Sequence, residues 1–391
     1  MKGIDPQSLC ADWSYPTRVR FGPGRIVELP EACRALGIAR PLLVTDPALA
    51  QHVIGHRVLE IARAAGLAVD LFADVRPNPV ETNVAAGVEL FRAGGHDGVI
   101  ALGGGSGLDA AKAIAFMAGQ RRPIWDFEDR GDNWRRADAA GIAPVVAVPT
   151  TAGTGSEVGR ASVITKEDSH EKKIVFHPRM MPSVVIADPE LTVGLPAKLT
   201  AATGMDALAH NLEAFCAPGW HPMAAGIAVE GMRLIKDWLA KAVLDGGNLE
   251  ARAQMLVASS MGATAFQRGL GAVHALSHPL GGLYDAHHGT LNAILIPYVL
   301  KANRPAIEDR IVYLARCLDL ARGFDGLLDW LVTLRAETAM PHTLKEIGIG
   351  DNRVAEIGVA ATKDPSAGGN PIQFSAEEYA EIARKAVAGE L

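Results

Sequence analysis

The stretch Gly98-Val-Ile-Ala-Leu-Gly-Gly-Gly-Ser106 decides the fold class, because it joins a short apolar run to a glycine-rich turn. An uninterrupted apolar run of this length is typical of a strand buried on both faces of a parallel sheet. Similar runs recur at 41–46, 67–72 and 144–148, and segments with helical spacing lie between them at 47–65, 82–93 and 110–118. This alternation predicts a doubly wound, mainly parallel sheet that binds ligands at the carboxyl ends of its strands.

The pattern changes after about residue 188, where long Ala- and Leu-rich segments with helical period replace the strand-like runs. A chain of 391 residues also exceeds what one core usually supports. We therefore predict two domains: a dinucleotide-binding α/β domain over 1–192 and an all-α, metal-binding domain over 193–391.

Composition and charge exclude several classes of function. The net charge is −6 and no long basic cluster is present, so the sequence predicts no binding to nucleic acid or to an anionic membrane. No apolar stretch is long enough to span a bilayer, and no signal peptide is readable at the N-terminus. The four cysteines lie far apart without CxxC spacing, which favours a reducing compartment. We expect a cytoplasmic protein.

Two loops are candidates for binding a dinucleotide. At 103–106, glycines between a strand and a helix would let backbone N–H groups approach a pyrophosphate, with Asp109 in the first helical turn. The dinucleotide fingerprint GxGxxG is not met, because Leu108 stands where glycine is needed; a tight turn that binds nothing stays an alternative. The loop 150–156 combines hydroxyls and glycines and can either bind a ribose or phosphate or cap the next segment.

Asp46 ends the first clear strand, and two roles are compatible with that position. A carboxylate there can accept hydrogen bonds from the adenosine ribose and would repel a 2′-phosphate, which favours NAD over NADP. The Asp46-Pro47 pair is also a good helix start.

A second group of residues suggests a metal site. Asp206 and His210 are four residues apart, as are His274 and His278, so each pair shares one face of a helix; His287 and His288 follow a glycine-containing turn. A carboxylate with three imidazoles suits Fe²⁺, Zn²⁺ or a similar first-row ion. The set does not match the HExxH motif of zinc proteases, since residue 275 is alanine.

The order of these segments resembles the iron-containing (group III) alcohol dehydrogenases. The resemblance runs through Phe21-Gly-Pro-Gly24, Gly103-Gly-Gly-Ser106, Pro149-Thr-Thr-Ala-Gly-Thr154, Asp188-Pro-Glu-Leu191, Gly204-Met-Asp-Ala-Leu208, the segment 274–289 and Asn370-Pro371. It implies the two-domain fold shared with dehydroquinate synthase, and a homodimer or higher homo-oligomer with the strand near Thr17 to Phe21 at the contact.

The resemblance also implies site residues. The metal ligands would be Asp206, His210, His274 and His288, and His278 would lie close to the nicotinamide and relay the proton. A one-residue shift in register would exchange His288 for His287. The positions that match the family's cofactor site are Asp46, Asn78, Gly104, Gly105, Ser106, Asp109, Thr150, Thr151, Thr154 and Lys173.

Together with the resemblance, these observations predict an NAD(P)-dependent enzyme, with NAD favoured over NADP and Fe²⁺ over Zn²⁺. It would interconvert a small alcohol and its aldehyde or ketone by hydride transfer, with the ion acting as a Lewis acid on the substrate oxygen. A dehydroquinate-synthase-like lyase without net redox is the alternative, but the residues flanking the metal motifs are largely apolar and unsuited to a phosphorylated, carboxylated substrate. A third hypothesis is a protein that binds NAD or a metal without catalysing a reaction, although nothing obvious is missing from the site.

Overall fold

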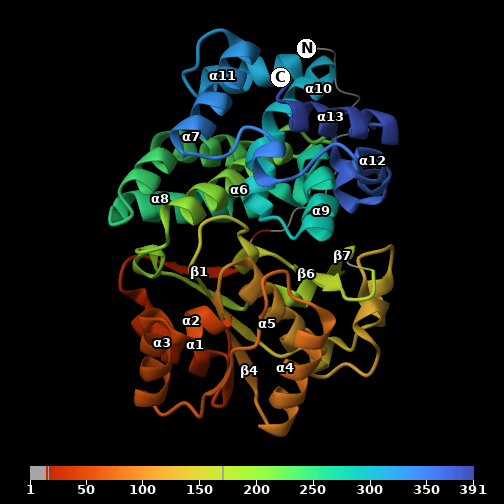
Figure 1. Ribbon diagram of the computed structural model, residues 1–391. Coiled ribbons are helices and arrows are strands. Elements are labelled where there is room, and N and C mark those ends of the chain that lie inside the picture. The colour runs from red at the N-terminus through yellow and green to blue at the C-terminus, as the bar shows by residue number, and fades with distance from the viewer. Residues whose placement is uncertain (1–14, 16, 170) are drawn as a thin grey trace. The chain divides into compact units, whose positions relative to one another are not determined.

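The computed structural model describes every residue except 1–14, 16 and 170. The chain divides into two compact units, Pro16–Val193 and Gly194–Leu391. Figure 1 shows strands and helices in the first unit and helices in the second. Among the described residues, no helix combines the length and apolarity needed to cross a bilayer.

The first unit is built on a six-stranded sheet in which every adjacent pair of strands is parallel. The strand order is β1-β8-β5-β4-β2-β3. The bounds are β1 (Arg18–Phe21), β2 (Pro41–Val44), β3 (Asp70–Phe72), β4 (Gly98–Gly103), β5 (Val145–Pro149) and β8 (Val184–Ala187). The four central strands are buried along their whole length, as their unbroken apolar sequences require. The predicted doubly wound sheet is confirmed.

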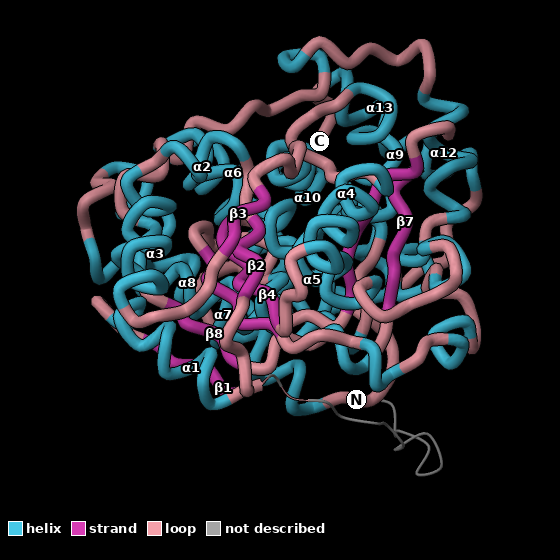
Figure 2. Tube along the Cα trace, turned by 90° about the horizontal axis from the view of Figure 1, so that it is seen from below, coloured by secondary structure: helices cyan, strands magenta, loops and turns pink. Residues whose placement is uncertain are grey.

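Helices cover both faces of this sheet. Figures 1 and 2 place α1 (Leu29–Ala35), α2 (Pro47–Gln51) and α3 (Val53–Ala64) on one side of the strands. They place α4 (Glu81–Ala93) and α5 (Gly105–Met117) on the other side. Alternate strand residues such as Ile100, Leu102 and Val146 join residues of α1 and α3 in one apolar core.

Two local predictions for this unit were wrong, and one pair of strands was missed. The helix expected over 47–65 is two helices, because His52 has an extended backbone and its Nδ1 accepts a hydrogen bond from the N–H of Ile54. The helix expected from residue 110 begins at Gly105, inside the glycine-rich turn. A two-stranded antiparallel sheet of β6 (Ala161–Lys166) and β7 (Glu171–Phe176) was not predicted at all.

The second unit contains helices and no strands, as predicted. Its long helices are α6 (Ala197–Cys216), α7 (Pro222–Leu244), α8 (Leu249–Ala265), α9 (Ala272–Tyr284), α10 (His288–Cys317), α11 (Gly323–Glu337), α12 (Val354–Lys363) and α13 (Ala376–Ala388). Two glycines let neighbours approach α6 closely. A Cβ on Gly204 would lie 2.2 Å from Leu239 of α7, and a Cβ on Gly289 would lie 2.2 Å from the carbonyl oxygen of Ala202. The second contact brings the start of α10 against α6.

Candidate metal and dinucleotide sites

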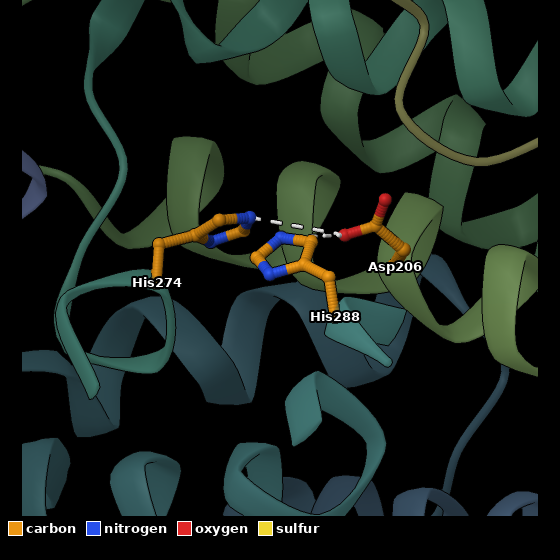
Figure 3. Close-up of side chains that lie close together, drawn as sticks. All are labelled: Asp206, His274 and His288. Atoms are coloured by element: carbon orange, nitrogen blue, oxygen red, sulfur yellow. Dashed lines mark ion pairs between the residues drawn. The ribbon is translucent and has the colours of Figure 1, made fainter. Parts of the chain in front are cut away.

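Three imidazoles surround one carboxylate in the helical unit. Asp206 and His210 lie one turn apart on α6, His274 is on α9, and His288 is the first residue of α10. The Nε2 atoms of His210 and His274 each lie 3.8 Å from Asp206 Oδ1, and that of His288 lies 3.4 Å from the same oxygen. Figure 3 shows His274 and His288 both directed at the Asp206 carboxylate.

The separations among Asp206, His274 and His288 fit three ligands of a single divalent ion, and His210 lies beside this group. Bonds of about 2.1 Å to nitrogen and oxygen place tetrahedral ligand atoms roughly 3.4 Å apart. The ligand atoms of Asp206, His274 and His288 all lie within 4.8 Å of one another. The His210 ring stacks on that of His274, with centroids 4.7 Å apart and planes inclined by 16°. Imidazole and carboxylate donors suit Fe²⁺ and Zn²⁺ alike.

A buried carboxylate fixes the orientation of His274. Nδ1 of His274 lies 2.5 Å from Glu213 Oε2, while Glu213 Oε1 accepts a hydrogen bond from the backbone N–H of Val273. Because a carboxylate can only accept, Nδ1 carries the proton and Nε2 presents its lone pair toward Asp206. Burial lowers the pKa of His274, but Glu213, Asp206 and Asp364 together outweigh burial and leave the pKa above its usual value.

Asn292 completes the polar contacts of the cluster. Its Nδ2 donates to Asp206 Oδ1 at 2.7 Å and lies 3.2 Å from Nε2 of His288. Sequence reasoning missed both Glu213 and Asn292. Their spacing was a usable signal, since Glu213 is two helical turns after Asp206 and Asn292 is one turn after His288.

His278 lies beside the cluster and has its own carboxylate partner. Its ring stacks on that of His288, with centroids 5.4 Å apart, and its Nδ1 donates to Asp364 Oδ2 at 2.8 Å. Burial raises the pKa of Asp364, but His278 and the hydrogen bonds from Ser366 outweigh burial and hold the pKa below its usual value. Asp364 also caps the short helix Pro365–Gly369 through Oδ1. Sequence reasoning did not find Asp364.

His287 lies apart from this cluster. It is the residue that precedes α10, and it lines a different pocket together with Tyr284 and Asp285. The next residue, His288, is the one whose Nε2 lies near Asp206.

The two loops predicted to bind the dinucleotide touch each other at the ends of adjacent strands. Thr150 follows β5, and its N–H donates to the carbonyl oxygen of Gly103, the last residue of β4. A Cβ on Gly104 would lie 3.0 Å from Thr151 Oγ1, and a Cβ on Gly105 would lie 2.6 Å from Thr154 Cγ2. These glycines are therefore required for the two loops to approach each other. Ser106 lies in the first turn of α5.

Asp109 and a buried lysine tie the threonine-rich loop to α5. Asp109 Oδ1 accepts from Ser156 Oγ at 2.5 Å, and its Oδ2 accepts from the backbone N–H of Val163 at 3.0 Å. Lys112 Nζ lies 3.3 Å from Asp109 Oδ1 and donates to the carbonyl oxygens of Ser156 and Ala161. Burial lowers the pKa of Lys112. Both carboxylate oxygens of Asp109 thus hold protein atoms in place. Sequence reasoning missed Lys112.

The remaining predicted cofactor residues lie on other elements. Asp46 caps α2 by accepting a hydrogen bond from the N–H of Leu49 at 2.9 Å, which is the helix-start role anticipated for it. Asn78 has a positive φ of 52° in the segment before α4. Lys173 lies on β7, with Nζ 3.2 Å from Glu128 Oε1.

Comparison with known proteins identifies the family to which the chain is similar. The model of the family "Iron-containing alcohol dehydrogenase" matches residues 16–189, and the model of that family's C-terminal domain matches residues 200–387. The 4-hydroxybutyrate dehydrogenase of Cupriavidus necator is 39% identical over 93% of this chain and 97% of its own.

Two solved structures are similarly close. The crystal structure of a 1,3-propanediol oxidoreductase has a TM-score of 0.90 at 35% identity and covers 96% of this chain and 99% of its own. The sulfoacetaldehyde reductase of Bifidobacterium kashiwanohense, solved in complex with NAD⁺, has a TM-score of 0.88 at 30% identity. The match covers 96% of this chain and 98% of the reductase.

Proposed function

This chain belongs to the iron-containing alcohol dehydrogenase family, and from that premise we propose which residues hold the metal, the dinucleotide and the substrate. The enzyme is an NAD-dependent oxidoreductase that interconverts an alcohol and its carbonyl product. Its relatives are dehydrogenases and reductases, so the lyase alternative is not favoured. We assign dinucleotide binding to residues 1–192 and metal binding to residues 193–391.

We propose that Asp206, His210, His274 and His288 hold one divalent ion, and that this ion is Fe²⁺. The observation that carries the proposal is the convergence of three Nε2 atoms on a single oxygen of Asp206 at 3.4–3.8 Å. Without a cation, three imidazole lone pairs and a carboxylate would be buried against one another at an electrostatic cost. The match to the iron-containing family supports Fe²⁺ over Zn²⁺.

When bound, the ion held by Asp206 and the histidines would supply a Lewis acid for the substrate oxygen, and the dinucleotide would supply the hydride chemistry. The protein's own residues supply alignment and proton transfer. Glu213 directs Nε2 of His274 into the cluster. Asp364 accepts from Nδ1 of His278, which leaves Nε2 of His278 to take the proton that the substrate hydroxyl loses.

For the dinucleotide we propose that the pyrophosphate lies over Gly104, Gly105 and Ser106 at the start of α5, where backbone N–H groups and the helix dipole favour anions. Thr150, Thr151 and Thr154 offer hydroxyls on the adjacent loop. Asp46 would repel a 2′-phosphate, which supports NAD over NADP. The further contacts assigned to this cofactor are Asn78, Asp109 and Lys173.

We propose that the substrate is a short linear primary alcohol with a second polar end. The relatives named for 4-hydroxybutyrate and 1,3-propanediol support this substrate class. We also propose a homodimer or higher homo-oligomer in the cytoplasm. Among the described strands, β1 is at the edge of the sheet and exposes Val19 and Phe21, which supports a contact there.

The metal assignment is tested by His274→Ala, assayed with Fe²⁺, Zn²⁺ and no added metal. We expect loss of bound metal and of alcohol-dependent NADH formation, while NADH binding followed by fluorescence stays within about twofold of wild type. A variant that retained full turnover in chelator would refute the Lewis-acid role. A panel of short alcohols, diols and hydroxy acids, run with NAD and with NADP, tests the substrate and cofactor.

A further inference from the structure

A pocket of about 750 Å³ lies in the helical unit where α6 ends and α7 begins. Its lining includes Phe215, Trp220, Gly226, Arg268 and Arg310. None of its lining residues belongs to the Asp206–histidine cluster or to the dinucleotide loops. The enzyme's reaction therefore gives this pocket no role.

Two arginines in the pocket carry charge that the protein does not neutralise. Burial lowers the pKa of both, and repulsion by Arg310 contributes to lowering the pKa of Arg268 to about 10. Among the described residues, no carboxylate forms an ion pair with either guanidinium. Both arginines are partly exposed and line the pocket, so a ligand there can reach their charges, and charged side chains normally find a counter-charge. Two adjacent arginines without an acid are therefore typical of an anion site.

A structural role accounts for only part of this arrangement. Arg268 donates to the carbonyl oxygens of Phe215 and Gly219 at 3.2 and 2.9 Å, and Arg310 donates to that of Ala217 at 3.4 Å. These carbonyls at the end of α6 are suitable partners for cations. They carry no net charge, however, and each guanidinium has about five N–H donors. Within the described residues, Nε of Arg268 is buried without an acceptor.

The start of α7 adds a further attraction for an anion. This helix begins at Pro222, and Ala225 and Gly226 of its first turns line the pocket. His221 caps this helix by accepting from the N–H of Ala224, so the start of α7 contributes the positive end of the helix dipole and not a set of free N–H groups. A Cβ on Gly226 would meet nothing within 4 Å, so the pocket is open at this point. Trp220 supplies flat apolar surface beside the charges, whereas the buried ring of Phe215 lies against the guanidinium of Arg310, whose Cζ is 5.2 Å from the ring centroid.

We propose that this pocket binds a small organic oxyanion, a carboxylate or phosphate carried on an aromatic ring. The oxyanion pairs with Arg268 and Arg310 at the start of α7, and the ring lies against Trp220. A guanidinium recognises either oxyanion with paired N–H donors, so the geometry suits both.

Calorimetric titration of the metal-loaded enzyme, saturated with NADH so that the dinucleotide loops are filled, tests the proposal. The probes are benzoate and phenyl phosphate, with benzamidine as the same ring carrying the opposite charge. We expect one binding site per chain for benzoate, for phenyl phosphate or for both, and none for benzamidine. The tighter anion identifies the preferred oxyanion. Binding of benzamidine as tightly as benzoate, or no binding of either anion, would overturn the proposal.

Two variants locate the site. Gly226→Leu fills the pocket without changing either arginine, and Arg310→Gln removes one charge. Each variant should weaken anion binding roughly tenfold or more. The leucine side chain would occupy the ligand's space, and loss of Arg310 removes hydrogen bonds from a charged donor, which contribute at least that factor. The control is Arg304→Gln, which removes an exposed, ion-paired arginine of the same helix α10 and should leave affinity unchanged.

Unchanged affinity in Gly226→Leu would place the anion elsewhere and refute the assignment, whether or not Arg310→Gln folds. Light scattering provides a further check. If Gly226→Leu changes the oligomeric state while wild type binds no probe, the pocket is a contact between chains and the proposal is wrong.

Discussion

Glu213 is the residue whose effect on the metal site can be tested most cleanly. Glu213→Gln keeps an acceptor for the N–H of Val273 but removes the charge that fixes Nδ1 of His274 as the donor. Loss of such a partner typically weakens metal binding roughly 10- to 100-fold. Competition with a coloured chelator measures this affinity. Glu230→Gln, which removes an acid from α7, is the control. Equal metal retention in the two variants would contradict the role of Glu213.

Asp364 should act on turnover and not on metal content. Asp364→Asn still caps the helix Pro365–Gly369, because asparagine is an equally good capping residue. The neutral amide can donate as well as accept, so it no longer keeps the proton of His278 on Nδ1. Nε2 of His278 is then less often free to accept the proton that the substrate hydroxyl loses. We expect kcat to fall about tenfold or more, within the range typical of general acid–base catalysis. If bound metal falls in parallel, Asp364 supports the cluster and not His278.

The residues of the site differ in how far the sequence could reveal them. The pairs Asp206–His210 and His274–His278 stand out because histidine is rare and the four-residue spacing places each pair on one helix face. Glu213 lies on the same helix as Asp206, and Asn292 on the same helix as His288, at helical spacing. Acids and amides are common on helices, however, so this spacing is a weaker signal than a pair that contains histidine. Asp364 lies 86 residues after His278, and only the packing of the chain brings the two together.

At the level of elements, Gly105 tests the contact between the two dinucleotide loops. In Gly105→Ala the new Cβ would lie 2.6 Å from Thr154 Cγ2, so the loops must separate. We expect the dissociation constant for NADH, followed by fluorescence, to rise about tenfold or more, while metal content stays unchanged. Thr154→Ser removes the colliding methyl group, so the double variant Gly105→Ala/Thr154→Ser should recover most of the lost affinity. Failure of the second change to restore binding would show that Gly105 acts through its own backbone.

The elements were predictable where burial is uniform. The central strands have unbroken apolar sequences, so β2, β4 and β5 were predicted within two residues at each end. The hairpin of β6 and β7 was not predicted. Its sequences mix lysines and acids with apolar residues, and its strands pair outside the main sheet. The boundary between α2 and α3 at His52 depends on a capping hydrogen bond, and the spacing of apolar residues does not reveal such a cap.

Among the cysteines that the structure describes, one is buried in each unit, and at the scale of the whole molecule these two thiols can report opening of the two units separately. Burial raises the pKa of Cys33, on α1, and of Cys216, on α6, to about 12 in each case. Alkylation by iodoacetamide needs an exposed thiolate, so near neutral pH each cysteine should react only when its surroundings open. Cys317, which is partly exposed, serves as the internal reference.

Metal and dinucleotide should then protect different thiols. A ligand present at 100 times its dissociation constant stabilises the state that binds it by about 2.7 kcal/mol, or roughly 100-fold in population. Chelation should therefore speed alkylation of Cys216, which follows Asp206 and His210 on α6, far more than that of Cys33. Saturating NADH should slow Cys33 selectively. Peptide mass spectrometry gives both rates in one sample, and equal acceleration by chelator would show that the two units open together.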